Sequence, residues 1–87
     1  MRITELIGQN IRRHRRAKDI TIQELSERSG LTVNYISLIE KGDANASLNK
    51  IHAIIQGLQV HWEDIIPTRE QEKTLRHDSS DADVLTK

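Results

Sequence analysis

The sequence predicts an all-α fold built from five short helices. Aliphatic residues recur at helical spacing along most of the chain, and N-capping residues and glycines divide it into short segments. The 87 residues include one Trp, one Tyr and no Phe, so the core must consist mainly of Ile and Leu, which pack readily between helices. A chain of this length is expected to form one compact domain with a tail.

The first helix is expected from Thr4 to about Lys18. Aliphatic residues recur along it at four-residue spacing, and the opposite positions are charged, which is typical of a helix with one buried face. The expected buried stripe comprises Ile3, Leu6, Ile7 and Ile11. The helix is followed by a short connection, Asp19-Ile20, in which Ile20 is expected to be buried.

The second and third helices are expected to be joined by a sharp turn. Thr21 and Glu24 have the spacing of a capping box at the start of the second helix. Gly30 ends this helix because it adopts the left-handed conformation without a steric penalty. Thr32 then caps the third helix, which ends at Gly42 for the same reason.

The fourth helix is expected to begin after the N-cap Ser47. Its predicted buried stripe comprises Leu48, Ile51, Ile54, Ile55 and Leu58. Val60 is expected to re-enter the core, and a short fifth helix is predicted at 62–66. Pro67 ends that helix because proline lacks the amide hydrogen that a helix interior needs.

The composition changes at Pro67, so residues 1–66 are predicted to form the domain and 67–87 a polar C-terminal extension. A capping box at Thr68 and Gln71 predicts a short helix over 68–77, and the polar, acidic composition beyond it predicts disorder. The net charge is zero, which counts against a global basic field. A local basic cluster is nevertheless present, and it comprises Arg12, Arg13, Arg15, Arg16 and Lys18.

Several classes of function find no support in the sequence. It has no Cys, and its four His show no metal-ligand spacing, so neither disulfides nor a metal site is expected. It has no glycine-rich phosphate loop and no nucleophile motif, so we expect neither an enzyme nor a bound cofactor. No stretch reaches membrane-spanning length and no leader is recognisable, so a cytoplasmic protein without membrane association is expected.

The third predicted helix carries small, uncharged residues on its outward face. Helical spacing turns Ile36 and Ile39 toward the core and leaves the other face exposed. The outward residues are Thr32, Val33, Asn34, Tyr35, Ser37 and Leu38. Two short helices joined by a sharp turn, with such a face on the second helix, are typical of proteins that place this second helix in a DNA groove to contact the bases.

The segment 11–66 resembles the Cro/C1-type helix-turn-helix domain, also called lambda-repressor-like or XRE. This family includes phage repressors, bacterial regulators and restriction–modification controller proteins. The matching residues are Ile11, Arg15, Thr21, Leu25, Gly30, Ile36, Ile39, Glu40, Gly42, Ser47, Leu48, Leu58 and Val60. The stretches YISLIEKG and IIQGLQV are particularly similar to controller proteins.

The resemblance implies roles for individual residues. Base contacts are expected from Thr32, Val33, Asn34 and Leu38. Phosphate contacts are expected from Thr21, Tyr35, Ser37, Lys41, Asn45, Asn49 and Lys50. Arg15 and Glu40 are expected to form a structural ion pair. Two positions depart from the family pattern: Ile22 replaces a phosphate-binding Gln, and Gln59 occupies a left-handed position where Gly is usual.

The resemblance also implies a transcription regulator that binds double-stranded DNA as a homodimer on a palindromic operator, with half-sites about 34 Å apart. The dimer surface is expected around His52, Leu58, Trp62 and Ile66, extended by 68–77. Two alternatives stay open. One is an autoregulating antitoxin whose C-terminal extension binds a toxin. The other is a protein-interaction module that does not bind DNA. RNA polymerase is a further candidate partner of a regulator.

Overall fold

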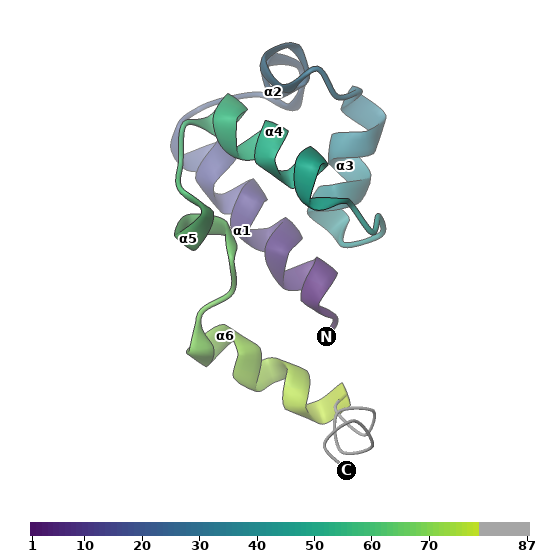
Figure 1. The fold of residues 1–87 in the computed structure, drawn as a ribbon, viewed down its shortest axis with the longest axis vertical. Helices are drawn as coiled ribbons and strands as arrows, with labels where there is room; N and C mark the ends of the chain where they lie inside the picture. The colour runs from purple at the N-terminus through teal and green to yellow at the C-terminus, as the bar shows by residue number, and fades with distance from the viewer. Residues whose placement is uncertain (79–87) are drawn as a thin grey trace.

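The computed structural model describes the backbone of residues 1–78 and the side chains of residues 1–75 (Figure 1). These residues form helical segments and no strand. The segments are α1 (Ile3–Ala17), α2 (Ile22–Ser29), α3 (Val33–Lys41), α4 (Leu48–Leu58), α5 (Trp62–Ile65), α6 (Arg69–Glu72) and the 3-10 helix η1 (Lys73–Asp78). The predicted all-α fold class is therefore confirmed, with the five expected helices in residues 1–66. Disorder was predicted from Asp78 onward. The backbone of Asp78 instead forms the last residue of η1, and residues 79–87 lie outside the described part.

The predicted N-caps are present at α2, α3 and α4. The hydroxyls of Thr21, Thr32 and Ser47 accept hydrogen bonds from backbone amides three residues later, at 3.0, 3.1 and 3.3 Å. The capping box expected at α2 is only half formed. Instead of reaching back to the Thr21 amide, the Glu24 carboxylate pairs with Arg28 one turn along the helix, at 2.6 Å.

The predicted helix ends are also present. Gly30 and Gly42 end α2 and α3 with φ angles of 77° and 80°. Gln59 ends α4 with a φ of 58°, which is the left-handed conformation expected for this position. At the start of α1, the backbone amide of Arg2 donates to the Glu5 carboxylate at 2.8 Å. This hydrogen bond and a second one from the Arg2 side chain lower the pKa of Glu5.

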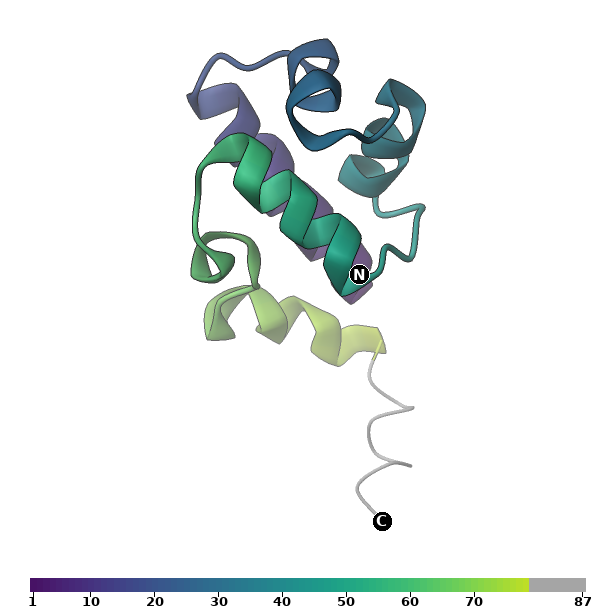
Figure 2. The same ribbon diagram turned by 45° about the horizontal axis from the view of Figure 1, so that its top comes forward.

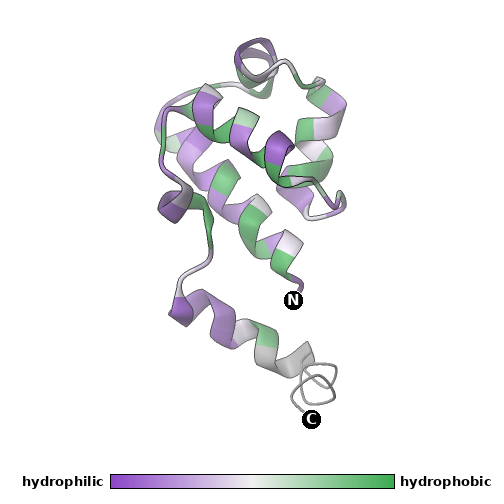
Figure 3. Ribbon diagram, viewed as in Figure 1, coloured by the Kyte–Doolittle hydropathy of each residue, from purple (hydrophilic) through white to green (hydrophobic). Residues whose placement is uncertain are grey.

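The core lies between α1, α2, α3 and α4, is closed by α5, and consists of aliphatic side chains as predicted. The ribbon in Figure 3 shows hydrophobic residues in green along these helices. Its buried members are Ile11, Ile20, Leu25, Leu31, Ile36, Ile39, Ile51, Ile54, Ile55, Leu58 and Ile65. Two residues assigned to buried stripes from helical spacing are exposed instead. Ile3 is 43% and Leu48 is 75% exposed, so both assignments were wrong. Each is the first residue of its helix.

The helices α1 and α3 approach so closely that their backbones are almost in contact. A Cβ atom built on Gly8 of α1 would lie 2.3 Å from the carbonyl oxygen of Ile39 and 2.6 Å from that of Glu40. Thr4 adds a hydrogen bond from its hydroxyl to the Gly42 carbonyl, at 3.0 Å. Gly8 thus sets the distance between the two helices, and the position of α3 depends on it.

The segment after Pro67 packs against α1 through a buried amide. Asn10 is 1% exposed and donates to the Ile65 carbonyl at 2.8 Å. It also exchanges hydrogen bonds with the side-chain amide of Gln71, at 2.8 and 3.2 Å. The helix predicted over 68–77 occurs as α6 followed by η1, at the end of the molecule opposite α2 in both views (Figures 1 and 2).

Candidate nucleic-acid interface

The turn between α2 and α3 is held by side-chain hydrogen bonds as well as by Gly30. The Ser26 hydroxyl donates to the Leu31 carbonyl at 2.5 Å, and the Leu31 amide donates to the Ser29 hydroxyl at 3.2 Å. Leu31 is itself buried, so the turn is attached to the core. A small residue at position 26 therefore lets α2 and α3 cross closely while satisfying a backbone carbonyl.

The outward face of α3 begins with exposed side chains. Thr32, Val33 and Asn34 are exposed, and Leu38, one turn later, is half-buried. The opposite face of α3 is fixed by Ile36 and Ile39 in the core. The first turn of a helix also presents backbone amides without intrahelical partners and a partial positive charge. This end of α3 can therefore bind an anionic surface, and Val33 and Asn34 are the exposed side chains at that end.

The residues expected at phosphates all reach the surface. Thr21, Lys41, Asn45, Asn49 and Lys50 are exposed, and Tyr35 and Ser37 are half-buried. They belong to the N-terminal ends of α2, α3 and α4, to the end of α3, and to the loop between α3 and α4. Tyr35 packs partly against the core, so its ring supports α3.

The Arg15–Glu40 pair joins α1 to α3 inside the domain. Arg15 donates from Nε and Nη2 to the two carboxylate oxygens of Glu40, at 2.7 and 3.0 Å. Its remaining terminal nitrogen, Nη1, donates to the Ile20 carbonyl at 2.9 Å. The two side chains are 11% and 4% exposed. One guanidinium thus ties together α1, the connection after it, and the recognition-helix candidate α3.

The residues expected at a dimer surface do not all reach the surface. Leu58 is completely buried and belongs to the core, so its assignment to the dimer surface was wrong. Helical spacing places Leu58 on the apolar side of α4 but does not show that α2 covers this end of the helix. His52 is exposed and stacks on Trp62, with ring centroids 5.8 Å apart. Trp62 and Ile66 are 37% and 46% exposed.

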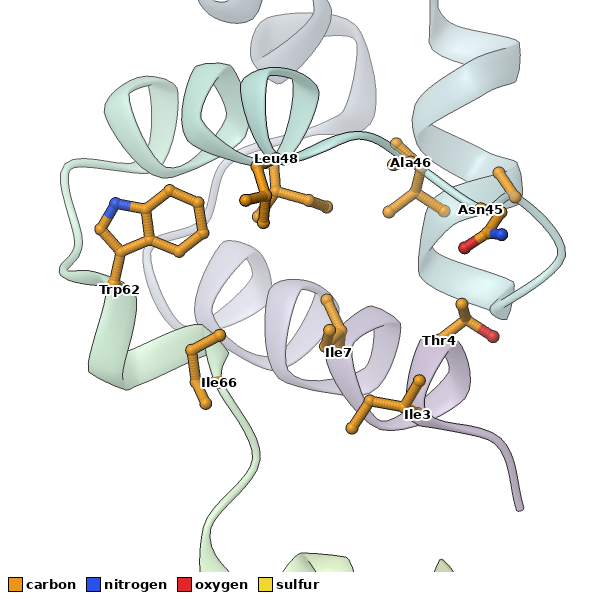
Figure 4. A pocket seen from close by; sticks show the side chains of 11 residues that line it. Ile3, Thr4, Ile7, Asn45, Ala46, Leu48, Trp62 and Ile66 are labelled. Atoms are coloured by element: carbon orange, nitrogen blue, oxygen red, sulfur yellow. The ribbon is translucent and has the colours of Figure 1, made fainter. Parts of the chain in front are cut away.

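An open apolar groove lies beside these exposed residues (Figure 4). Its apolar walls come from α1, from the end of α3 and the loop after it, from the start of α4, and from α5 with the residue after it. Their large side chains are Ile3, Ile7, Ile39, Leu48, Ile51, Trp62 and Ile66. Ile3 and Leu48 were not expected here, because sequence spacing assigned them to the core. Gly8 and Asn10 were also missed, since neither residue type signals a close helix contact or a buried amide.

The described residues contain no helix both long and apolar enough to span a membrane. They also contain no group of three or more His, Asp or Glu side chains positioned to hold a metal ion. The surface described above combines the exposed end of α3, the polar residues around it and the apolar groove. The helices α2 and α3, joined by the turn at Gly30, form a helix-turn-helix.

The comparison with known proteins identifies the family. The Helix-turn-helix family model matches residues 11–65, and the chain belongs to this Cro/C1-type family. It is similar to an uncharacterised HTH-type transcriptional regulator of Methanothermobacter thermautotrophicus, with 43% identity over 56 residues, covering 63% of this chain and 81% of the relative. It is also similar to the uncharacterised HTH-type transcriptional regulator y4dJ of Sinorhizobium fredii, with 37% identity over 71 residues, covering 80% of this chain and 92% of the relative.

Solved structures agree with this assignment. The restriction–modification controller protein C.AhdI from Aeromonas hydrophila has a TM-score of 0.69 at 29% identity, covering 71% of this chain and 94% of that one. The clp gene regulator ClgR from Corynebacterium glutamicum has a TM-score of 0.72 at 26% identity, covering 75% and 84%. The chain is a transcriptional regulator with a helix-turn-helix domain, related to restriction–modification controllers, and such regulators are generally not enzymes.

Proposed function

We propose that this regulator binds a specific double-stranded DNA operator as a homodimer, with α3 of each protomer in the major groove. The observation that carries the proposal is the exposed first turn of α3, which holds Val33 and Asn34 on a helix whose other face is buried. The Arg15–Glu40 pair fixes that helix to α1. A rigid helix with an exposed N-terminal turn suits the reading of base edges.

The chemistry of the exposed residues suggests which bases are read. The Asn34 amide can donate to N7 and accept from N6 of one adenine, a bidentate contact specific to that base. Val33 and Leu38 are apolar and suit the C5-methyl groups of thymines. Thr32 keeps a hydroxyl hydrogen to donate, since its oxygen already accepts from the Tyr35 amide. The operator is therefore expected to be rich in A·T pairs at these positions.

The backbone of the DNA is held by local contacts. Because the chain has no net charge, binding depends on phosphate contacts near α3 and not on a global basic field. These contacts are proposed for Thr21, Tyr35, Ser37, Lys41, Asn45, Asn49 and Lys50. Several of these residues begin helices, where backbone amides add to the side-chain donors.

The apolar groove is proposed as the surface that receives a second copy of the chain. Leu48, Trp62 and Ile66 are large hydrophobic side chains exposed around one groove, which is unusual for a solvated surface. His52 flanks it through its stack on Trp62. An isologous dimer would place two α3 helices on a palindrome with half-sites about 34 Å apart. The similarity to C.AhdI favours a controller type of regulator.

The chain divides into a DNA-binding domain and a C-terminal extension. We assign residues 1–66 to the DNA-binding domain and 67–87 to an extension. The described part of that extension rests on the domain through the Asn10–Gln71 amide pair, on the side of α1 that faces α5. It lies at the end of the molecule opposite α2, so it leaves the proposed DNA surface open (Figure 2).

Selection from a random duplex library tests the function as a whole. The full-length protein is expected to enrich one palindromic sequence whose half-sites are one helical turn apart. The salt concentration must be fixed and stated, because phosphate contacts make affinity salt-dependent. Failure to enrich any sequence would support the protein-interaction module instead.

Replacing Asn34 by alanine is expected to weaken operator binding by about 5- to 150-fold, equivalent to the roughly 1–3 kcal/mol of a bidentate base contact. The fold should be unaffected because the Asn34 side chain is exposed and makes no hydrogen bond within the described residues. Fluorescence anisotropy with the selected operator measures the effect. Gln23→Ala, an exposed change on α2, is the control and should change affinity far less. Equal operator affinities of Asn34→Ala and wild type would show that Asn34 does not contact the bases.

Replacing Leu48 by glutamate is expected to weaken dimerisation at least about tenfold, because it removes roughly 1.5–3 kcal/mol of apolar burial and adds a charge. The monomer should stay folded, since Leu48 is 75% exposed in the isolated chain. Sedimentation velocity over a concentration series gives the dimer dissociation constant. Gln56→Glu adds the same charge to an exposed position of α4 outside the groove and should leave the dimer intact. A Leu48→Glu variant that dimerises like wild type would place the interface elsewhere.

A further inference from the structure

The outward face of α1 carries a group of exposed arginines. Arg12, Arg13 and Arg16 are exposed, and with Gln9 they line one shallow hollow. None of the three side chains makes an ion pair or hydrogen bond with the described residues 1–75, in contrast to Arg15 and Arg28, whose guanidinium groups are engaged. Three clustered cations without a carboxylate repel one another in the free protein. An anionic partner would relieve this repulsion.

This basic face is continuous with the proposed DNA surface. Arg16 also lines a second hollow, together with Arg15, Asp19, Ile20 and Thr21. Thr21 is the N-cap of α2 and a proposed phosphate contact. The basic face therefore begins where the proposed phosphate contacts end and continues along the exposed face of α1. Asp19 is the one acid lining either hollow, so the combined surface keeps a positive balance.

We propose that Arg12, Arg13 and Arg16 bind the phosphate backbone of the DNA flanking the operator, beyond the base pairs that α3 reads. The proposal rests on the proposed function. Guanidinium groups suit this role because they stay charged and bind phosphate oxygens with two parallel hydrogen bonds. Flanking contacts read no sequence. They raise affinity and set the length of duplex that the regulator occupies.

The size of the effect follows from counterion release. Each phosphate neutralised on duplex DNA contributes about 0.9 to the slope of log affinity against log salt. Losing two such contacts in one protomer should reduce the magnitude of this slope by about 1.8. The loss of affinity between 50 and 200 mM salt would then be roughly 12-fold smaller than for wild type. A dimer that makes these contacts on both flanks should show about twice this change in slope.

The test compares two duplexes with the full-length chain. One duplex ends at the selected operator, and the other carries an extra helical turn on each side. The variant is Arg12→Gln with Arg16→Gln, and the matched control is Arg69→Gln with Lys73→Gln, which removes two exposed charges from α6 and η1. Dissociation constants are measured by anisotropy from 50 to 200 mM salt, and circular dichroism verifies the fold of each variant.

The proposal predicts that wild type binds the longer duplex more tightly and with a steeper salt slope. The Arg12/Arg16 variant should lose this advantage and bind the short duplex like wild type, while the control retains the advantage. Equal losses on both duplexes would place the arginines inside the operator and overturn the flanking role. Unchanged binding to both duplexes, with transcriptional control impaired, would point to an acidic protein surface and overturn it as well. If wild type binds no duplex, the proposed function fails and this proposal fails with it.

Discussion

Replacing Arg15 by alanine is expected to lower the free energy of unfolding by about 3–5 kcal/mol. The substitution leaves the Glu40 carboxylate buried, with its two hydrogen bonds from Arg15 removed. It also leaves the Ile20 carbonyl without its side-chain donor. Because small domains are stable by only about 5–15 kcal/mol, the loss should be visible as a large shift in a urea unfolding curve.

Two further variants separate the buried pair from charge in general. Lys73→Ala breaks an exposed pair with Glu70 and should change stability by less than about 1 kcal/mol. Combining Arg15→Met with Glu40→Leu removes both buried charges and should recover part of the lost stability. If Arg15→Ala unfolds at the same urea concentration as wild type, the pair does not hold α1 to α3.

Replacing Gly8 by alanine is expected to destabilise the domain by roughly 1–3 kcal/mol. The added methyl group would meet the carbonyl oxygens of Ile39 and Glu40 at 2.3 and 2.6 Å, and these are backbone atoms that cannot rotate away. The gain of about 1 kcal/mol in helix propensity offsets part of the cost. Because α1 and α3 must separate, we also expect weaker operator binding at temperatures where the variant is fully folded.

Gly57→Ala is the matched control, since Gly57 is also a buried glycine inside a helix. Its added methyl group would meet the end of the Leu25 side chain at 3.0 Å, which can move. The variant should therefore unfold close to wild type. Both variants are compared by thermal and urea denaturation. A Gly8→Ala protein as stable as Gly57→Ala would show that the distance between α1 and α3 can relax without cost.

The sequence was sufficient to predict features that depend on local chemistry. Thr21, Thr32 and Ser47 were predicted as N-caps because their hydroxyls accept hydrogen bonds from unpaired backbone amides. Gly30 was predicted as a left-handed helix end because glycine adopts that conformation without a steric penalty. Helical spacing also located Ile36 and Ile39 as buried residues of α3. These signals located the start and end of α3 and, with them, the exposed first turn that forms the candidate site.

Features that depend on neighbouring helices could not be predicted in the same way. The spacing of α4 gave Leu48 and Leu58 the same apolar face, yet Leu58 is buried and Leu48 is exposed, because α2 covers only the C-terminal end of α4. Gly8 looked like an ordinary helix residue until α3 was placed beside it. Asn10 interrupted an apolar face without indicating that Gln71, 61 residues later, supplies its partner.

The central claim is that the first turn of α3 reads base edges directly. The most direct test is to repeat the duplex selection with Asn34→Ala beside wild type. We expect the variant to enrich the same palindrome but to lose its preference at one adenine position, placed symmetrically in each half-site. An unchanged preference at every position, with affinity merely reduced, would contradict the claim that this turn enters the major groove.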